Sequence, residues 1–176
     1  MKYYSTAKLA LSAITNARLL LGVEFEPHQI KRAVQGANTF LLYPSPEAQN
    51  CEEALLDSES TVIVVDGTWE EAGKILFRNP ELKEFPCLTF EQPLRSNYRI
   101  RKQPRDNYLS TIESIAQLLK LNAAAQGLVA EGLLYDRLLA GFDRMVEEQL
   151  RHIPKRRRAN RSGAFDTAQA IDELPS

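Results

Sequence analysis

The chain has 176 residues, of which 44% are hydrophobic and 26% charged, a length and composition typical of one globular domain. Its net charge of −1 indicates no class of partner, because acidic residues gather at positions 52–59 and basic residues at positions 151–161. No stretch approaches the roughly 20 apolar residues of a membrane span, and the start lacks the apolar run of a signal peptide. We therefore expect a cytoplasmic protein with no membrane partner.

The first third of the chain predicts helices and one strand. Residues 6–21 carry leucine and alanine at helical spacing and end at a glycine, which predicts one long helix. Residues 26–36 are typical of a short polar connection or a helical turn. Residues 38–43 predict a strand that stops at a proline, and a short helix is predicted over residues 48–56.

The most informative stretch begins with the β-branched run 61–65, which predicts a strand buried on both faces of a parallel sheet. Asp66 follows at the carboxyl end of this strand, the edge at which open α/β sheets bind ligands. Thr68 and Glu71 form a T-x-x-E capping box that opens a helix, which ends before a proline. An ordinary capped turn with Trp69 in the core explains the same residues, so a ligand site and a structural turn are both open interpretations.

A basic loop follows the next predicted strand, residues 86–90. Residues 94–105 interleave positive charges with Tyr98 and an isoleucine. Guanidinium groups suit phosphate oxygens, and a tyrosine can stack on a base or a cofactor ring. A solvated loop face explains this pattern equally well. The basic positions are Arg95, Arg99, Arg101, Lys102 and Arg105.

The last part of the chain predicts two helices and a tail. Ser110 and Glu113 form a second capping box, which opens a helix with an apolar face, and a longer helix is predicted over residues 127–150. Residues 154–176 have few large apolar side chains, which predicts a mobile basic tail. The alternation of strands and helices predicts an α/β fold with a mainly parallel sheet and helices on both faces.

The sequence lacks the motifs of several common classes of binding and catalytic site. No glycine-rich dinucleotide or P-loop fingerprint is present, and neither His28 nor His152 follows a predicted strand, so both are expected at the surface. Cys51 and Cys87 are isolated, which predicts no disulfide framework and no metal site and fits a reducing compartment. Asp66 is then the candidate general base.

Three short motifs in the same order give the sequence a family resemblance. Residues 66–69 (DGTW), 95–101 (RSNYRIR) and 109–113 (LSTIE) resemble the D-x-T-W, S-x-Y-x-x-R and L-S-T-x-E motifs of the DTW-domain family. The resemblance covers about residues 38–121. It implies similarity to tRNA-uridine aminocarboxypropyltransferases, which move the 3-amino-3-carboxypropyl group of S-adenosylmethionine to N3 of a uridine and leave methylthioadenosine. Kinship with a SPOUT-like enzyme implies a trefoil knot at the cofactor pocket.

The resemblance also implies roles for single residues. Asp66 becomes the base that removes the N3 proton of the uridine. The positions expected to hold S-adenosylmethionine are Thr68, Trp69, Tyr98, Leu109, Ser110 and Thr111. The positions expected to hold tRNA are Arg95, Arg99, Arg101, Lys102 and Arg105. No metal is expected.

The start of the chain departs from the family pattern. Family members commonly carry a cysteine-rich N-terminal segment and an H-P-x-E element, whereas here no cysteine precedes Cys51, and only Thr15, Asn16 and Arg18 loosely match a later family helix. We expect residues 1–153 to form a DTW domain with a shortened N-terminal element. A non-catalytic RNA-binding homologue that has lost this part of the site is the alternative to an active transferase.

Overall fold

The structure is a computed structural model that describes residues 6–14, 16–34, 38–54, 56–90, 96–98 and 109–152. The tail predicted at residues 154–176 lies outside this range. The helices are α1 (Thr6–Ala13), α2 (Pro27–Ala33), α3 (Trp69–Arg78), α4 (Thr111–Ala125) and α5 (Val129–Arg151), with a 3-10 helix η1 (Pro80–Glu84). The strands are β1 (Thr39–Leu42), β2 (Gln49–Asn50), β3 (Thr61–Val64) and β4 (Cys87–Thr89).

The strands pair in parallel in one four-stranded sheet of order β2-β4-β1-β3. Thr39 of β1 lies opposite Thr61 of β3, and Leu41 lies opposite Cys87 of β4. Parallel neighbours need a crossover connection, and α3 with η1 carries the chain from β3 past β1 to β4. The predicted α/β fold with a parallel sheet is therefore confirmed, as are the predicted strands at residues 38–43 and 86–90.

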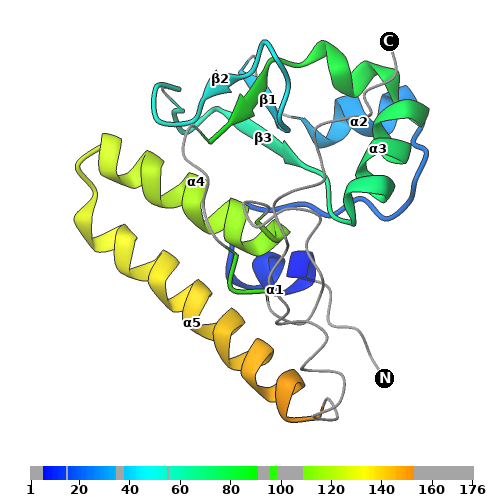
Figure 1. Ribbon diagram of the computed structural model, residues 1–176. Coiled ribbons are helices and arrows are strands. Elements are labelled where there is room, and N and C mark those ends of the chain that lie inside the picture. Colours follow the sequence, from blue (N-terminus) through cyan, green and yellow to red (C-terminus); the bar gives the residue numbers. More distant parts are fainter. Residues whose placement is uncertain are drawn as a thin grey trace, which may run out of the picture.

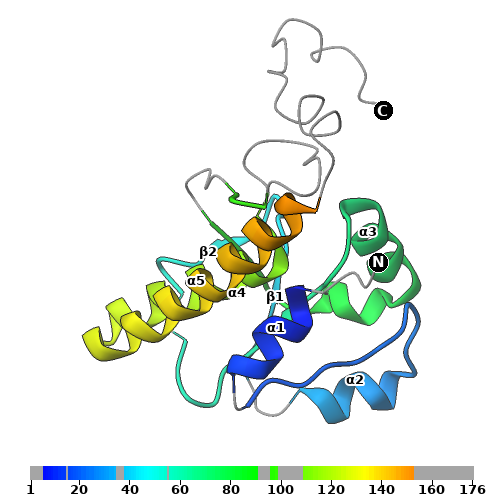
Figure 2. The same cartoon turned by 90° about the horizontal axis from the view of Figure 1, so that it is seen from below.

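Helices cover both faces of the sheet because β1 directs alternate side chains to opposite faces. Phe40 and Leu42 pack in a cluster with Leu118 of α4, whereas Leu41 packs with Ile30 of α2 and Leu76 of α3. Figures 1 and 2 show α4 and α5 on one side of the sheet and α2 and α3 on the other. The prediction of helices on both faces is confirmed.

A second body of core joins α1, α4 and α5. Phe142 and Val146 of α5 are completely buried and pack with Ile112 of α4 and Ala10 of α1. Helices α4 and α5 form a long hairpin that leaves the sheet at an angle, with α1 beside it (Figure 1). This packing fixes the first turn of α4 relative to α1, which matters for the site described below.

The burial predicted for β3 is wrong. The strand was expected to be covered on both faces, but it lies at the edge of the sheet and all its residues are only partly buried. A β-branched run fits a pleated strand whether the strand is central or at an edge, so the sequence pattern did not distinguish the two. The edge position leaves the residues after β3 accessible.

The long helix predicted over residues 6–21 ends at Ala13. Beyond it the Ala17 amide donates to the Ile14 carbonyl at 3.4 Å in a turn, and Leu21 is 80% exposed. The Arg18 guanidinium donates to the Arg32 carbonyl at 3.0 Å, at the end of α2. Just after the predicted helix, the buried Asn79 donates from its side-chain amide to the Val23 carbonyl at 2.9 Å and accepts through Oδ1 from the Phe25 amide at 2.8 Å.

The short helix predicted over residues 48–56 is also wrong. This segment contains β2 followed by turns. The Asn50 side chain accepts a hydrogen bond from the Glu52 amide at 3.0 Å, and the Cys51 amide donates to the Thr89 carbonyl of β4 at 2.8 Å. An asparagine that binds its own backbone two residues on favours a turn over a helix.

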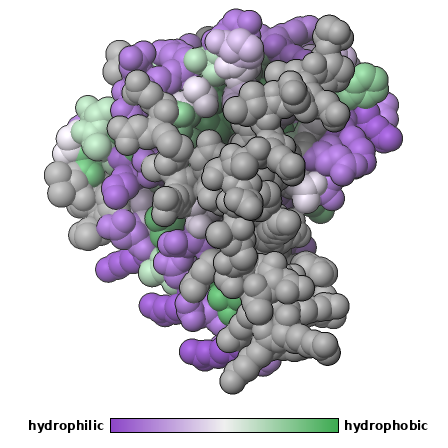
Figure 3. All heavy atoms as spheres, in the orientation of Figure 1, coloured by the Kyte–Doolittle hydropathy of each residue, from purple (hydrophilic) through white to green (hydrophobic). Residues whose placement is uncertain are grey.

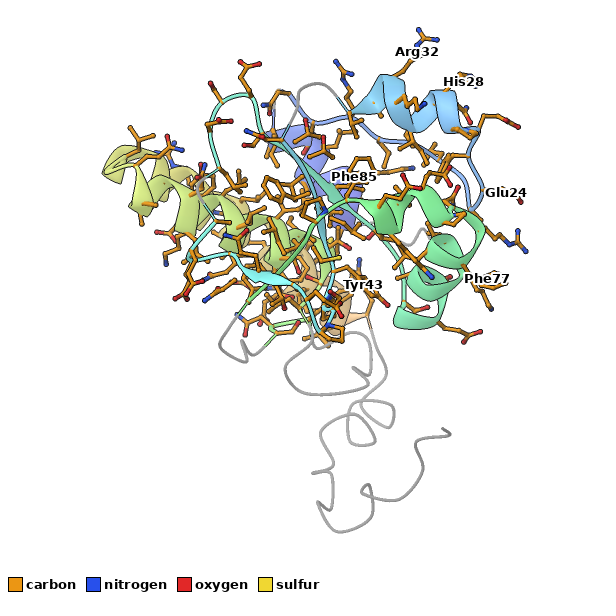
Figure 4. The ribbon with its side chains drawn as sticks, turned by 90° about the horizontal axis from the view of Figure 1, so that it is seen from above. Glu24, His28, Arg32, Tyr43, Phe77 and Phe85 are labelled. Carbon is orange, nitrogen blue, oxygen red and sulfur yellow. The ribbon has the colours of Figure 1, made fainter. Side chains whose placement is uncertain are left out.

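The histidines and cysteines lie away from any shared site. His28 and His152 are exposed, as predicted, and Figure 4 shows His28 and Arg32 pointing outward from α2. Cys51 is buried and Cys87 partly buried, both as free thiols. Within the described ranges, the side chains include no cluster of three or more metal-ligating residues. None of the helices that the structure describes is long and apolar enough to cross a membrane.

Candidate functional site

Asp66 marks the carboxyl edge of the sheet, two residues after β3 ends at Val64. Its side chain is exposed. Gly67 follows with a φ of 155°, and a Cβ atom at this position would lie 3.0 Å from the Cβ of Glu71. This contact is tighter than nearly all real Cβ contacts, and side-chain-bearing residues rarely adopt this φ, so the turn that presents Asp66 favours glycine here.

Two hydroxyl groups from distant parts of the chain meet one oxygen of Asp66. Thr111, the first residue of α4, donates from Oγ1 to Oδ1 at 2.6 Å. Thr6, the buried first residue of α1, lies with its hydroxyl 3.5 Å from the same oxygen, a long and therefore weak hydrogen bond. The carboxylate is thus tied to the starts of α1 and α4 as well as to the sheet.

The first capping box forms as predicted at the start of α3. The Thr68 hydroxyl accepts from the Glu71 amide at 3.2 Å, and the Glu71 carboxylate accepts from the Thr68 amide at 2.7 Å. Both residues are exposed. Trp69 opens the helix, as expected, but its side chain lies outside the described part of the structure.

The second capping box also forms, and its glutamate binds two groups outside the box. Glu113 is only 7% exposed. Its Oε2 accepts from the Ser110 amide at 2.7 Å and the Ser110 hydroxyl at 2.6 Å. The same carboxylate accepts from the Ser96 hydroxyl at 2.7 Å and, through Oε1, from the Asn97 amide at 2.6 Å. Ser96, Asn97 and Tyr98, the S-N-Y motif, are therefore joined by hydrogen bonds of Ser96 and Asn97 to the first turn of α4.

Tyr98 turns toward the core of the helical hairpin. Its ring lies 5.5 Å from that of Phe142 of α5, centroid to centroid, at an inclination of 49°. Its amide donates to the Ser96 hydroxyl at 3.0 Å. The predicted stacking of Tyr98 on a ligand stays a prediction, and the ring contact with Phe142 gives this residue a packing role independent of any ligand.

The structure brings together some of the predicted residues and adds others. Asp66 binds Thr111, and the next residue back, Ser110, is linked through Glu113 and Ser96 to Tyr98. Leu109 precedes Ser110 as a partly buried residue. The predicted RNA contacts Arg95, Arg99, Arg101, Lys102 and Arg105 lie outside the described residues.

Sequence reasoning missed two participants. Nothing in the sequence around Thr6 connects it with Asp66, which lies 60 residues further along the chain. Glu113 was assigned only to a capping box. Its wider role has no local signal, because Ser96 and Asn97 lie 17 and 16 residues before it in the chain.

A separate apolar cavity of about 210 Å³ lies between α1, α4 and α5. Leu9, Leu119, Tyr135 and Leu138 are among its lining residues, and none of the predicted site residues is. On the face of the molecule in Figure 3, hydrophilic residues predominate and hydrophobic ones are scattered. The hydrogen-bonded group around Asp66 and Glu113 is therefore the stronger candidate site.

Comparison with known families agrees with the motifs. The profile of the DTW domain matches residues 1–150. The chain belongs to the DTW-domain family. This assignment covers α1 as well as the three motifs, so the start of α1 that reaches Asp66 is part of the DTW domain.

Curated relatives of this DTW domain carry one name. The chain is 32% identical over 127 residues to tRNA-uridine aminocarboxypropyltransferase 2 of Macaca fascicularis, which covers 70% of this chain and 41% of the relative. The mouse protein of the same name gives the same values, and that of Drosophila melanogaster is 33% identical over 105 residues, or 56% of this chain and 41% of the relative. The chain thus spans about two fifths of these relatives. No solved structure matches it.

Proposed function

We propose that this DTW domain transfers a 3-amino-3-carboxypropyl group from S-adenosylmethionine to N3 of a uridine in tRNA. The observation that carries the proposal is the placement of Asp66. The aspartate of the D-x-T-W motif is exposed at the carboxyl edge of a parallel sheet and is held by the threonine of the L-S-T-x-E motif. Open α/β sheets bind ligands at this edge, and two relatives named tRNA-uridine aminocarboxypropyltransferase 2 are 32% identical to the chain over 70% of its length.

The chemistry requires a base and an accessible approach to it. Asp66 accepts the N3 proton of the uridine, the nitrogen lone pair attacks the methylene carbon attached to sulfur, and the carbon–sulfur bond breaks. The electron pair of that bond goes to sulfur, which neutralises the sulfonium and releases methylthioadenosine. The Thr111 hydroxyl, 2.6 Å from Oδ1, fixes the carboxylate for this proton transfer.

The residues around Asp66 suit S-adenosylmethionine in part. Thr68, Trp69, Leu109 and Thr111 begin or precede α3 and α4, whose N-terminal dipoles favour the carboxylate of the methionine part. Both donors of Ser110 are already engaged by Glu113, so Ser110 contributes through position rather than as a free donor. The knotted SPOUT-like pocket remains part of the proposal.

The transfer is tested with S-adenosylmethionine labelled in two ways. Purified protein is incubated with unmodified tRNA and with cofactor carrying the label on either the carboxyl carbon or the methyl group. The carboxyl label is expected in the tRNA and the methyl label in methylthioadenosine. Methyl label in the tRNA would identify a methyltransferase instead, and tRNA binding without either label would identify the non-catalytic RNA-binding homologue.

Asp66→Asn tests the role of the base. The amide keeps the shape of the side chain but cannot accept the proton, so transfer is expected to fall by about 10²-fold or more. Asp57→Asn is a matched control, because Asp57 is also exposed and also bound by a hydroxyl, Ser60 Oγ at 2.8 Å. Transfer at the wild-type rate in Asp66→Asn would remove Asp66 from the mechanism.

The basic loop supplies the proposed tRNA contact. If Arg99 and Arg101 each neutralise one phosphate, replacing both with alanine should reduce the slope of log affinity against log salt by about 1.4. Filter binding of tRNA over a range of salt concentrations measures this slope. An unchanged slope in the double variant would assign these arginines a role other than phosphate binding.

A further inference from the structure

Glu113 holds more hydrogen bonds than a helix cap requires. The Ser110 amide and hydroxyl complete the cap, yet the carboxylate also accepts from the Ser96 hydroxyl and the Asn97 amide at 2.7 and 2.6 Å. A carboxylate that is only 7% exposed needs such donors, since a buried charge without partners is costly. Two separate segments of the chain, residues 96–97 and residue 110, therefore donate hydrogen bonds to Glu113.

These two segments lie on either side of the last four basic positions of the loop, residues 99–105, in sequence. Ser96 and Asn97 stand just before Arg99, and Ser110 stands after Arg105. One carboxylate binds both sides and so holds the two ends of the intervening chain together. Joining the ends of a loop removes part of its conformational freedom before any ligand binds.

The same carboxylate is linked to the candidate base. Ser110, which Glu113 binds, precedes Thr111, which donates to Asp66 at 2.6 Å. Ser96 supports the arrangement from the other side, because its hydroxyl also accepts from the Tyr98 amide at 3.0 Å, and the Tyr98 ring packs on Phe142. A continuous set of contacts thus connects the S-N-Y motif to the edge of the sheet.

We propose that Glu113 is a positioning residue of the transfer reaction, which sets the S-N-Y motif and the chain entering the basic loop at a fixed place relative to Asp66. This inference rests on the proposed function. Glu113 touches no reacting atom in this role. Its loss should weaken the productive binding of tRNA more than it slows the chemical step, because preorganisation of a binding loop reduces the ordering cost of binding.

Two substitutions separate positioning from helix capping. Glu113→Gln keeps the size of the side chain but leaves one oxygen where two accepted, and its NH₂ group faces a donor. Ser96→Ala removes the Ser96 donor to Glu113 and the acceptor of the Tyr98 amide, and it leaves the cap between Ser110 and Glu113 intact. If Glu113 acts only as a cap, the effects of Ser96→Ala and Glu113→Gln on transfer should be independent and should multiply in the double variant.

The decisive measurement is steady-state transfer with tRNA as the varied substrate, at a temperature where circular dichroism shows each variant folded. Glu113→Gln is expected to raise KM for tRNA about tenfold with less than a threefold change in kcat, and Ser96→Ala to raise KM about threefold. The double variant should show less than the product of the two single effects, because both substitutions weaken the hydrogen bond between Ser96 and Glu113. Glu148→Gln, an exposed glutamate on α5, is the control and should leave both constants unchanged.

Hydrogen exchange gives a second readout that does not depend on activity. The Asn97 amide, which donates to Glu113, is expected to exchange about tenfold faster in Glu113→Gln, while amides in β1 keep their rates. An unchanged KM in both variants, or an unchanged Asn97 rate, would overturn the positioning role. A wild-type protein that transfers no carboxyl label would instead overturn the proposed function, so the two failures are distinguishable.

Discussion

The two capping boxes of this protein look alike in sequence and differ in the folded chain. Thr68 and Glu71 at the start of α3 are exposed, and the side chain of each accepts a hydrogen bond from the backbone amide of the other. Ser110 and Glu113 at the start of α4 are buried, and Glu113 also binds residues 96 and 97. The same four-residue pattern therefore forms an exposed cap at the start of α3 and a buried part of the candidate site at the start of α4.

The difference arises from what packs against each helix. Helix α3 covers one face of the sheet with Leu76, and its opposite side is open to solvent. Helix α4 is enclosed by the sheet, α1 and α5, so its first turn is shielded from water. A carboxylate in that turn has to find protein donors, whereas Glu71 can be hydrated.

The largest expected effect on stability comes from Phe142 of α5, which packs against α4, and Phe77 of α3 is the comparison. Phe142→Ala should lower the free energy of unfolding by about 3–5 kcal/mol, because the completely buried ring supports α4, α1 and Tyr98 together. Phe77 on α3 is 81% exposed and points outward in Figure 4, so Phe77→Ala should change stability by less than about 0.5 kcal/mol. Urea unfolding measures both, and equal losses would mean that the surroundings of the two helices are alike.

The two glutamates themselves provide the next comparison. Glu113→Ala leaves the donors of buried Ser110, partly buried Ser96 and exposed Asn97 without their acceptor and should cost about 2–3 kcal/mol. Glu71→Ala removes an exposed cap partner and should cost about 0.5–1 kcal/mol. The midpoints of urea unfolding check this order, which would be contradicted if Glu71→Ala were the more damaging substitution.

The smallest effect concerns the sheet face beneath α4. Burial raises the pKa of the Cys51 thiol to about 11 from its ordinary 9.0. The unfolded chain therefore loses this proton at a lower pH than the folded one, so the stability tied to the neutral thiol is complete below pH 9.0 and is lost as pH rises toward 11. Cys51→Ala should reduce the alkaline decline of stability measured by urea unfolding at pH 8 to 10.5.

A control for this last experiment lies on the same sheet. Cys87 in β4 is only partly buried. If Cys87→Ala reduced the alkaline decline as much as Cys51→Ala does, burial of Cys51 beneath α4 would not be its cause.

Much of the fold could be predicted because local patterns agreed with the tertiary environment. The β-branched run before Asp66, the proline-bounded strand at β4 and both S/T-x-x-E boxes formed as expected. Predictions were wrong where side-chain hydrogen bonds competed with the expected helix. The distant Asn79 binds the chain at Val23 and Phe25, and Asn50 binds its own backbone two residues on and favours a turn where a short helix was predicted.

The candidate site was predicted only in outline. Asp66 follows from a strand, a turn glycine and a capped helix, all encoded within a few residues. Its partners Thr6 and Thr111 come from helices 60 and 45 residues away, and no local pattern encodes a hydrogen bond across such distances. The five basic positions expected to bind tRNA stay predictions.

The sequence by itself determined three of the four strands that the structure describes, the starts of α3 and α4, the family and the identity of the candidate base, because these depend on short-range spacing and on motifs that keep their order. Only the tertiary structure decided that β3 is an edge strand, that α1 stops at Ala13 and that Glu113 is buried. The physical reason is that burial depends on which elements pack together. A glutamate in a capping box remains an exposed cap or becomes the acceptor for two segments according to whether water can reach it.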